Sequence, residues 1–310
     1  MFDKDYSEKT LSLALAISAA AWGLYWYPLR ALENDGLSSA WSVAFFNAVP
    51  LLLLCPLLLF NYKKLRGVLG PTLLAALMIG LAFTLYSNGL VKTTIIRATM
   101  LYYLTPIWST LVGVIWLSEP LTRARIIAII VAFAGLFLLL SDGDSTDYPL
   151  NIGDFYSFLS GIFWAFGVAT LNRWSNIPIL PVAAFIFIST TAFSALFAGV
   201  LYVDPLPTLA MLEAAFPTAL VWSTFILLPC FCITFRVSQI LFPGRVGILI
   251  MTEVIVAIIS ASILVPEESM QWIQWVGVFA IIMAALIEVI FGSTKKVVVA
   301  DSTAETKQPA

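Results

Sequence analysis

Apolar residues dominate the chain in ten runs, each close to the ~20 residues that an α-helix needs to cross the hydrocarbon core of a bilayer. Polar or turn-forming residues separate the runs, such as Glu33-Asn34-Asp35-Gly36 and Pro266-Glu267-Glu268. The weakest break is Lys92 to Thr94, and fusion there would leave nine spans with the two termini on opposite sides. The pattern predicts an all-α integral membrane protein with ten transmembrane helices. The runs are residues 11–30, 40–60, 70–91, 94–117, 124–140, 152–173, 180–203, 211–236, 240–265 and 271–292.

The basic residues test this count, because short cytoplasmic loops are enriched in Lys and Arg. With ten spans and a cytoplasmic N-terminus, 13 of the 16 basic residues fall on the cytoplasmic side, and only Arg30, Lys92 and Arg97 do not. The connections after the fifth, seventh and ninth runs carry acidic residues and no Lys or Arg. Nine spans would scramble this order, so the charges favour ten spans with both termini in the cytoplasm.

Composition narrows the possible functions. Only 11% of the 310 residues are charged and 61% are hydrophobic, whereas a soluble domain carries about 25% charged residues. The absence of His removes His-based catalysis, and the three Cys lie in apolar runs, which favours small buried hydrophobes over disulfides. No basic cluster is large enough for nucleic acid. No Walker-type phosphate loop occurs, so no ATPase subunit is implied. The sequence also implies no cofactor or metal. The partners we expect are the lipid bilayer and a small-molecule substrate.

The chain also matches itself. Ser18 to Trp22 corresponds to Ser160 to Trp164 at an offset of 142 residues, and both Arg97 with Arg245 and Glu119 with Glu267 match at an offset of 148. The common order predicts two five-helix repeats. Because five is odd, the second repeat would be inverted around a central cavity near the membrane midplane. The predicted organisation is a cytoplasmic tail at 1–10, a first repeat at 11–140, an acidic extracytoplasmic linker at 141–151, a second repeat at 152–292 and a cytoplasmic tail at 293–310.

Two five-helix units, each with Trp and small residues in its first helix and an acidic turn such as Leu117-Ser-Glu-Pro-Leu-Thr122, resemble the drug/metabolite transporter superfamily in its EamA-type branch. The aromatic residues are most similar to those of the YddG group of aromatic amino acid exporters. The resemblance covers roughly residues 11–292. It implies a cavity lined by helices one, three, four, six, eight and nine, and amino acid export across the bacterial inner membrane. The second repeat departs from it, with Val265-Pro-Glu-Glu-Ser at the acidic turn.

Ionisable groups within a bilayer are costly, so those in mid-span are candidates for a substrate pathway. Glu253 lies about halfway along its run, where a carboxylate would bind a substrate ammonium or take up a proton. The alternative is a hydrogen-bonded acid that joins two helices.

The run at 94–117 supplies an aromatic face. Thr99, Tyr102, Tyr103 and Pro106 share one side of a helix, and Trp108 follows them. Pro106 removes a helical hydrogen bond, and we expect Thr105 to help satisfy the freed carbonyl. The face suits a pocket for a flat side chain, with helix packing as the alternative.

Four further residues extend this candidate pathway. Tyr86 and Asn88 end the preceding run, and Lys92 and Arg97 would form either a positive exit for a carboxylate or an interfacial belt.

Trp22 and Trp164 occupy equivalent mid-span positions of the two repeats, where cavity lining and core packing are equally plausible. Together these features predict a secondary transporter that exports aromatic and other neutral amino acids or similar metabolites by alternating access. The alternative is an exporter of lipophilic cations or drugs. An intramembrane enzyme is disfavoured, because the chain lacks His and paired acids.

Overall fold

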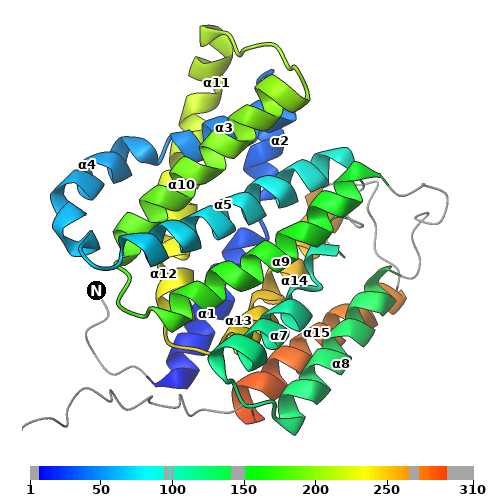
Figure 1. Cartoon of the computed structure of the whole chain (residues 1–310). Coiled ribbons are helices and arrows are strands. Elements are labelled where there is room, and N and C mark those ends of the chain that lie inside the picture. Colours follow the sequence, from blue (N-terminus) through cyan, green and yellow to red (C-terminus); the bar gives the residue numbers. More distant parts are fainter. Residues whose placement is uncertain (1–6, 94–97, 99–100, 141–150, 265–271, 292–310) are drawn as a thin grey trace, which may run out of the picture.

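The computed structural model describes residues 7–93, 98, 101–140, 151–264 and 272–291 (Figure 1). These residues form helices and connections, and no strand occurs among them. The α-helices are α1 (Glu8–Trp22), α2 (Trp26–Asn34), α3 (Ser39–Ala48), α4 (Leu51–Asn61), α5 (Leu69–Lys92), α7 (Thr105–Leu117), α8 (Arg123–Leu140), α9 (Ile152–Arg173), α10 (Ile179–Leu196), α11 (Leu209–Ala219), α12 (Leu228–Ser238), α13 (Pro243–Ile250), α14 (Thr252–Leu264) and α15 (Trp272–Phe291). Shorter elements are the 3₁₀-helix η1 (Tyr62–Leu65) and the π-helices η2 (Phe197–Leu201) and η3 (Leu220–Leu227).

Where the structure describes them, the apolar runs of the sequence coincide with helices or with broken helices. Within the described part of the chain, five helical segments are long and apolar enough to cross a membrane, and α3 with α4, bent by 47°, would make a sixth. These segments support a multi-pass membrane protein. The count of ten spans, the inversion of the second repeat and the domain boundaries stay predictions.

Several helices pack against partners that are distant in sequence. α5 runs along α9, and α8 runs along α15, as Figure 1 shows. α1 contacts α12, α13 and α14, which come from the far end of the sequence. The first helix is therefore surrounded by elements of the second half, and residues far apart in sequence meet beside it.

The break before α7 has its cause in Pro106. Proline lacks the N–H that would bond to the carbonyl four residues earlier, which here belongs to Tyr102. The hydroxyl of Thr105 donates to that carbonyl instead. This confirms the expectation that Thr105 satisfies the freed group. The helix restarts at Thr105 after a turn at Tyr103 and Leu104.

The run at 240–265 is also broken, which the sequence did not predict. A turn at Met251 separates α13 from α14, and the backbone N–H of Val254 bonds to the Met251 carbonyl at 3.1 Å. The Thr252 hydroxyl lies 2.9 Å from the Leu249 carbonyl and 3.0 Å from the Ala16 carbonyl of α1. Met251 corresponds to Tyr103 at the 148-residue offset, so both runs break at matching positions of the proposed repeats.

Candidate functional site

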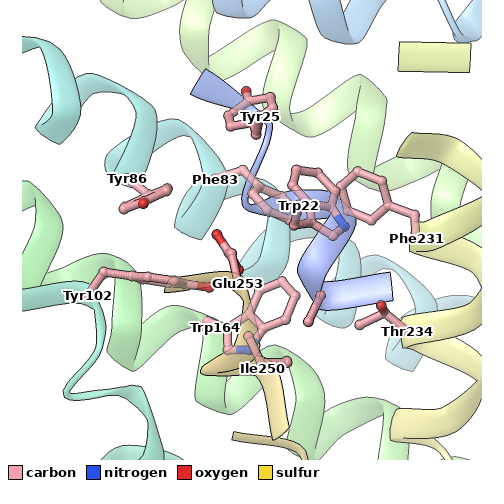
Figure 2. Close-up of a pocket in the computed structure, with 11 residues that line it drawn as sticks. Trp22, Tyr25, Phe83, Tyr86, Tyr102, Trp164, Phe231, Thr234, Ile250 and Glu253 are labelled. Atoms are coloured by element: carbon pink, nitrogen blue, oxygen red, sulfur yellow. The ribbon is translucent and has the colours of Figure 1, made fainter. Parts of the chain in front are cut away.

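A cavity lies beside α1, lined by residues of α1, α5, α9, α12, α13 and α14 (Figure 2). It encloses about 440 Å³ of space not filled by protein atoms, counting the part that opens outward. Seven of its eleven lining residues are aromatic, and one is a carboxylic acid. The other three are an alanine, an isoleucine and a threonine. The lining residues are Ala19, Trp22, Tyr25, Phe83, Tyr86, Tyr102, Trp164, Phe231, Thr234, Ile250 and Glu253.

Trp22 is the centre of the aromatic wall. Its ring stacks on Phe83 with centroids 5.2 Å apart and meets the edge of Phe231 at 4.3 Å. Tyr25, which follows the end of α1, lies 5.3 Å from the same ring. Trp22 is 9% exposed, so it belongs to the apolar core and borders the cavity at once. Both alternatives considered for it from the sequence apply.

Trp164 and the tyrosines complete the wall. Trp164 on α9 packs edge-on against Phe83 with centroids 5.4 Å apart. On the other side, the Tyr86 and Tyr102 rings are 4.4 Å apart and tilted by 32°. Such close ring pairs leave a narrow space between apolar faces, which suits a flat apolar group better than a hydrated polar one.

Glu253 is the carboxylate of the cavity. It lies in the first turn of α14, directly after the break at Met251, and Figure 2 shows its carboxyl group among Tyr86, Tyr102 and Trp164. Tyr102 and Tyr103 both interact electrostatically with it. The amino-terminal turn of a helix favours negative charge, because free N–H groups and the helix dipole point there. The break in the run therefore gives a carboxylate a favourable place in an apolar surrounding.

Contact with α1 fixes the position of this turn. A Cβ atom on Gly23 would lie 2.5 Å from the carbonyl oxygen of Glu253 and 2.8 Å from the backbone nitrogen of Ala257. Only glycine allows α1 to approach α14 so closely. The same crossing brings Trp22, one residue earlier, to the aromatic wall beside Glu253.

The structure brings together five of the residues singled out in the sequence, namely Trp22, Tyr86, Tyr102, Trp164 and Glu253. Four others do not line this cavity, although all are in described segments. Asn88 is buried, and its side-chain amide donates to the Thr84 carbonyl at 2.8 Å. Trp108 packs on Phe158, Tyr103 lies behind Tyr102, and Pro106 is in the first turn of α7.

The two basic residues expected at the exit have different outcomes. Lys92 ends α5 with its ammonium 3.9 Å from the centre of the Tyr202 ring, and it is exposed. Arg97 lies outside the described residues, as does Thr99 of the expected aromatic face. A role for either of these two stays a prediction.

Sequence reasoning missed six lining residues, and a simple signal could have found them. The lining residues recur at a spacing of three along each helix: Ala19, Trp22 and Tyr25; Phe83 and Tyr86; Phe231 and Thr234; Ile250 and Glu253. Residues three apart share a helix face. Extending each chosen residue by one turn would have added Ala19, Tyr25, Phe83 and Ile250. Phe231 and Thr234 had no chosen neighbour on α12.

A metal site has no support in the described part of the chain, where no group of three His, Cys, Asp or Glu side chains comes together. The cavity has one acid and no second ligand of that kind.

Comparison with known proteins gives three likenesses. Residues 10–141 match the model of the EamA-like transporter family. The uncharacterized transporter YojE of Bacillus subtilis (strain 168) is 29% identical over 141 residues, which is 40% of this chain and 44% of that protein. A crystal structure described only as that of a protein aligns with a TM-score of 0.68 and 16% identity, covering 91% of this chain and 96% of the other. This last likeness concerns the fold alone.

Proposed function

We propose that the protein is a secondary transporter, on the premise that residues 10–141 match the EamA-like transporter family. It exports neutral amino acids, aromatic ones in particular, or similar amphipathic metabolites across the bacterial inner membrane. The route is alternating access, in which the two five-helix units rock around the cavity beside α1.

One observation carries this proposal: a cavity walled by seven aromatic rings holds one carboxylate, Glu253. The rings would take the side chain of an aromatic or apolar amino acid, and Glu253 would take its ammonium group. The faces of Tyr and Trp also attract a desolvated cation, which adds to the attraction of the carboxylate. Amphipathic amines therefore match the cavity in both of their parts.

Release and coupling follow from the same site. A carboxylate that gives up an ammonium in an apolar cavity takes up a proton in its place, because an isolated buried charge is costly. Export would then respond to an imposed pH gradient. Lys92 and Arg97, on the expected outer side, would draw the substrate carboxylate toward the exit.

A second candidate, the export of lipophilic cations, is favoured by a different observation. No Lys or Arg is among the described residues that line the cavity. A zwitterionic amino acid would bring a carboxylate into the cavity, where no cationic side chain would pair with it. A lipophilic amine has no carboxylate and needs no such partner. The two candidates thus differ in whether the substrate carboxylate is tolerated.

Counterflow in proteoliposomes separates the candidates with three molecules of nearly equal shape: phenylalanine, phenethylamine and 3-phenylpropionate. Exchange of phenylalanine supports amino acid export, and exchange of phenethylamine alone supports the cation exporter. Both candidates exclude 3-phenylpropionate, because it has no ammonium for Glu253. Exchange of that acid alone, or of none of the twenty amino acids and no amine, would overturn the proposal.

A further inference from the structure

Two ionic contacts, one partly and one fully buried, lie away from the cavity, at the end of the bundle where α1 and α13 begin. Arg245, in the first turn of α13, is 1% exposed, and its Nη1 lies 3.1 Å from Oε2 of Glu8. Glu8 is the first residue of α1 and keeps part of its side chain exposed. The contact thus joins the starts of two helices that are more than 200 residues apart in sequence.

The second contact is an ion pair between Glu119 and Arg125, whose side chains are both 0% exposed. Glu119 follows Ser118, which ends α7 with a left-handed backbone at φ 54°. This turn directs Glu119 into the bundle, where the backbone N–H of Gly244 donates to its Oε2 at 3.4 Å. A Cβ atom on Gly244 would lie 2.9 Å from Oγ1 of Thr110, so the approach leaves no room for a side chain.

The Glu119–Arg125 pair itself lies within the first half of the chain, and Glu119 reaches the second half through the backbone N–H of Gly244. The next residue, Arg245, binds Glu8. The same end of the bundle also holds a neutral contact. The side-chain amide of Asn172 donates to the Leu241 carbonyl at 2.7 Å, which ties α9 to the connection before α13 within the second half. The carboxylates of Glu8 and Glu119 therefore each bind a residue of the second half, whereas this neutral contact lies within that half.

These contacts stand between one end of the bundle and the cavity. Ile250 lines the cavity and follows Arg245 by five residues on α13, a helical rise of about 7.5 Å. Along α1, the first cavity residue is Ala19, eleven residues after Glu8 and so about 16 Å further on. Along both helices, the contacts therefore lie between the cavity and this end of the bundle.

We infer that two contacts form an ionic latch that closes this end of the cavity and parts when the end opens: the Glu8–Arg245 ion pair, and the bond from the Gly244 N–H to Glu119, whose carboxylate Arg125 holds in place. The inference rests on the proposed transport by alternating access and names the element that changes state. Buried ion pairs suit this task, since the attraction between the charges is largely offset by the cost of removing them from water. When the end opens, water solvates the separated charges. The closed and open states then differ little in free energy. An apolar seal would instead favour the closed state, because opening it would expose apolar surface to water.

Access to the cavity from this end is the measurement that tests the latch. The reporter is Ala19→Cys in the full chain, with the three native cysteines replaced by serine. A tag shows which side of the proteoliposome membrane the N-terminus faces. A membrane-impermeant maleimide is applied from that side. We expect Glu8→Gln and Arg245→Gln each to raise the labelling rate about tenfold or more, because each removes a charge-assisted hydrogen bond of the closed state only. Lys9→Gln, at an exposed neighbouring position, serves as the matched control and leaves the rate unchanged.

The exchanged pair, Glu8→Arg with Arg245→Glu, keeps the latch with reversed charges and is expected to return labelling to the original rate. This variant remains informative if Arg245→Gln folds poorly. Unchanged labelling in Glu8→Gln overturns the latch, and so does an equal rise in Lys9→Gln, which would indicate general loosening. Labelling needs no substrate, so the latch is tested even if counterflow finds none. Conversely, transport together with unaltered labelling in the variants would disprove the latch and leave the proposed function intact.

Discussion

Gly23 and Glu253 touch through their backbones, with the position of a Gly23 Cβ atom 2.5 Å from the Glu253 carbonyl oxygen. This contact couples the end of α1 to the start of α14. The contact also holds the Trp22 ring and the Glu253 carboxylate, which both line the cavity, in position relative to each other. The helix crossing is therefore part of the site as well as of the core.

Gly23→Ala should damage the site without changing any lining side chain. The added methyl group has to push α1 away from α14, and overpacking of this kind costs about 1–3 kcal/mol. We expect a lower unfolding temperature in detergent and a loss of counterflow. Gly70→Ala is the matched control, because nothing lies within 4 Å of its Cβ position. Equal behaviour of the two variants would show that the crossing has room to spare.

Glu253→Gln should lower affinity for every amine substrate while the protein stays folded. The amide keeps the shape of the side chain but removes the charge that holds an ammonium, and a charged hydrogen bond contributes about 1.5–3 kcal/mol, or roughly 10–100-fold in affinity. The measurement is the concentration dependence of counterflow. Glu213→Gln, at an exposed position of α11, is the control. If Glu253→Gln retained full affinity and lost only stability, Glu253 would be the acid that joins two helices.

The sequence was sufficient to predict the helices, because hydrophobic runs of ~20 residues indicate segments that cross a membrane. The span count and sidedness drawn from the basic residues stay predictions. The sequence also identified Glu253, since a carboxylate in a long apolar run stands out. It did not predict the break at Met251, which has no Pro or Gly to mark it. Nor could it distinguish Phe231, which is buried against Trp22, from Phe225 on the preceding turns, which is exposed. Such choices depend on tertiary packing rather than on local pattern.

Phe231→Ala should widen the cavity and change its size preference. The Phe231 ring lies 4.3 Å from Trp22 and 5.0 Å from Phe83, so its removal opens space beside both. We expect competition assays to shift from phenylalanine toward tryptophan, with a stability loss of about 3–5 kcal/mol. Phe225→Ala is the control, because that ring is 67% exposed. A stability loss with unchanged preference would place Phe231 outside the binding space.

Thr105 and Pro106 should show strong energetic coupling, because one repairs the defect that the other creates. Pro106 leaves the Tyr102 carbonyl without its helical donor, and the Thr105 hydroxyl donates to it. Thr105→Val then leaves a buried carbonyl unsatisfied, at a cost of about 1–3 kcal/mol, while Thr105→Ser keeps the bond. In a Pro106→Ala background the regained N–H takes over, and Thr105→Val should cost little. Thermal unfolding of the four variants completes the double-mutant cycle. Costs that simply add would mean that the hydroxyl does not replace the missing N–H, and the break before α7 would need another support.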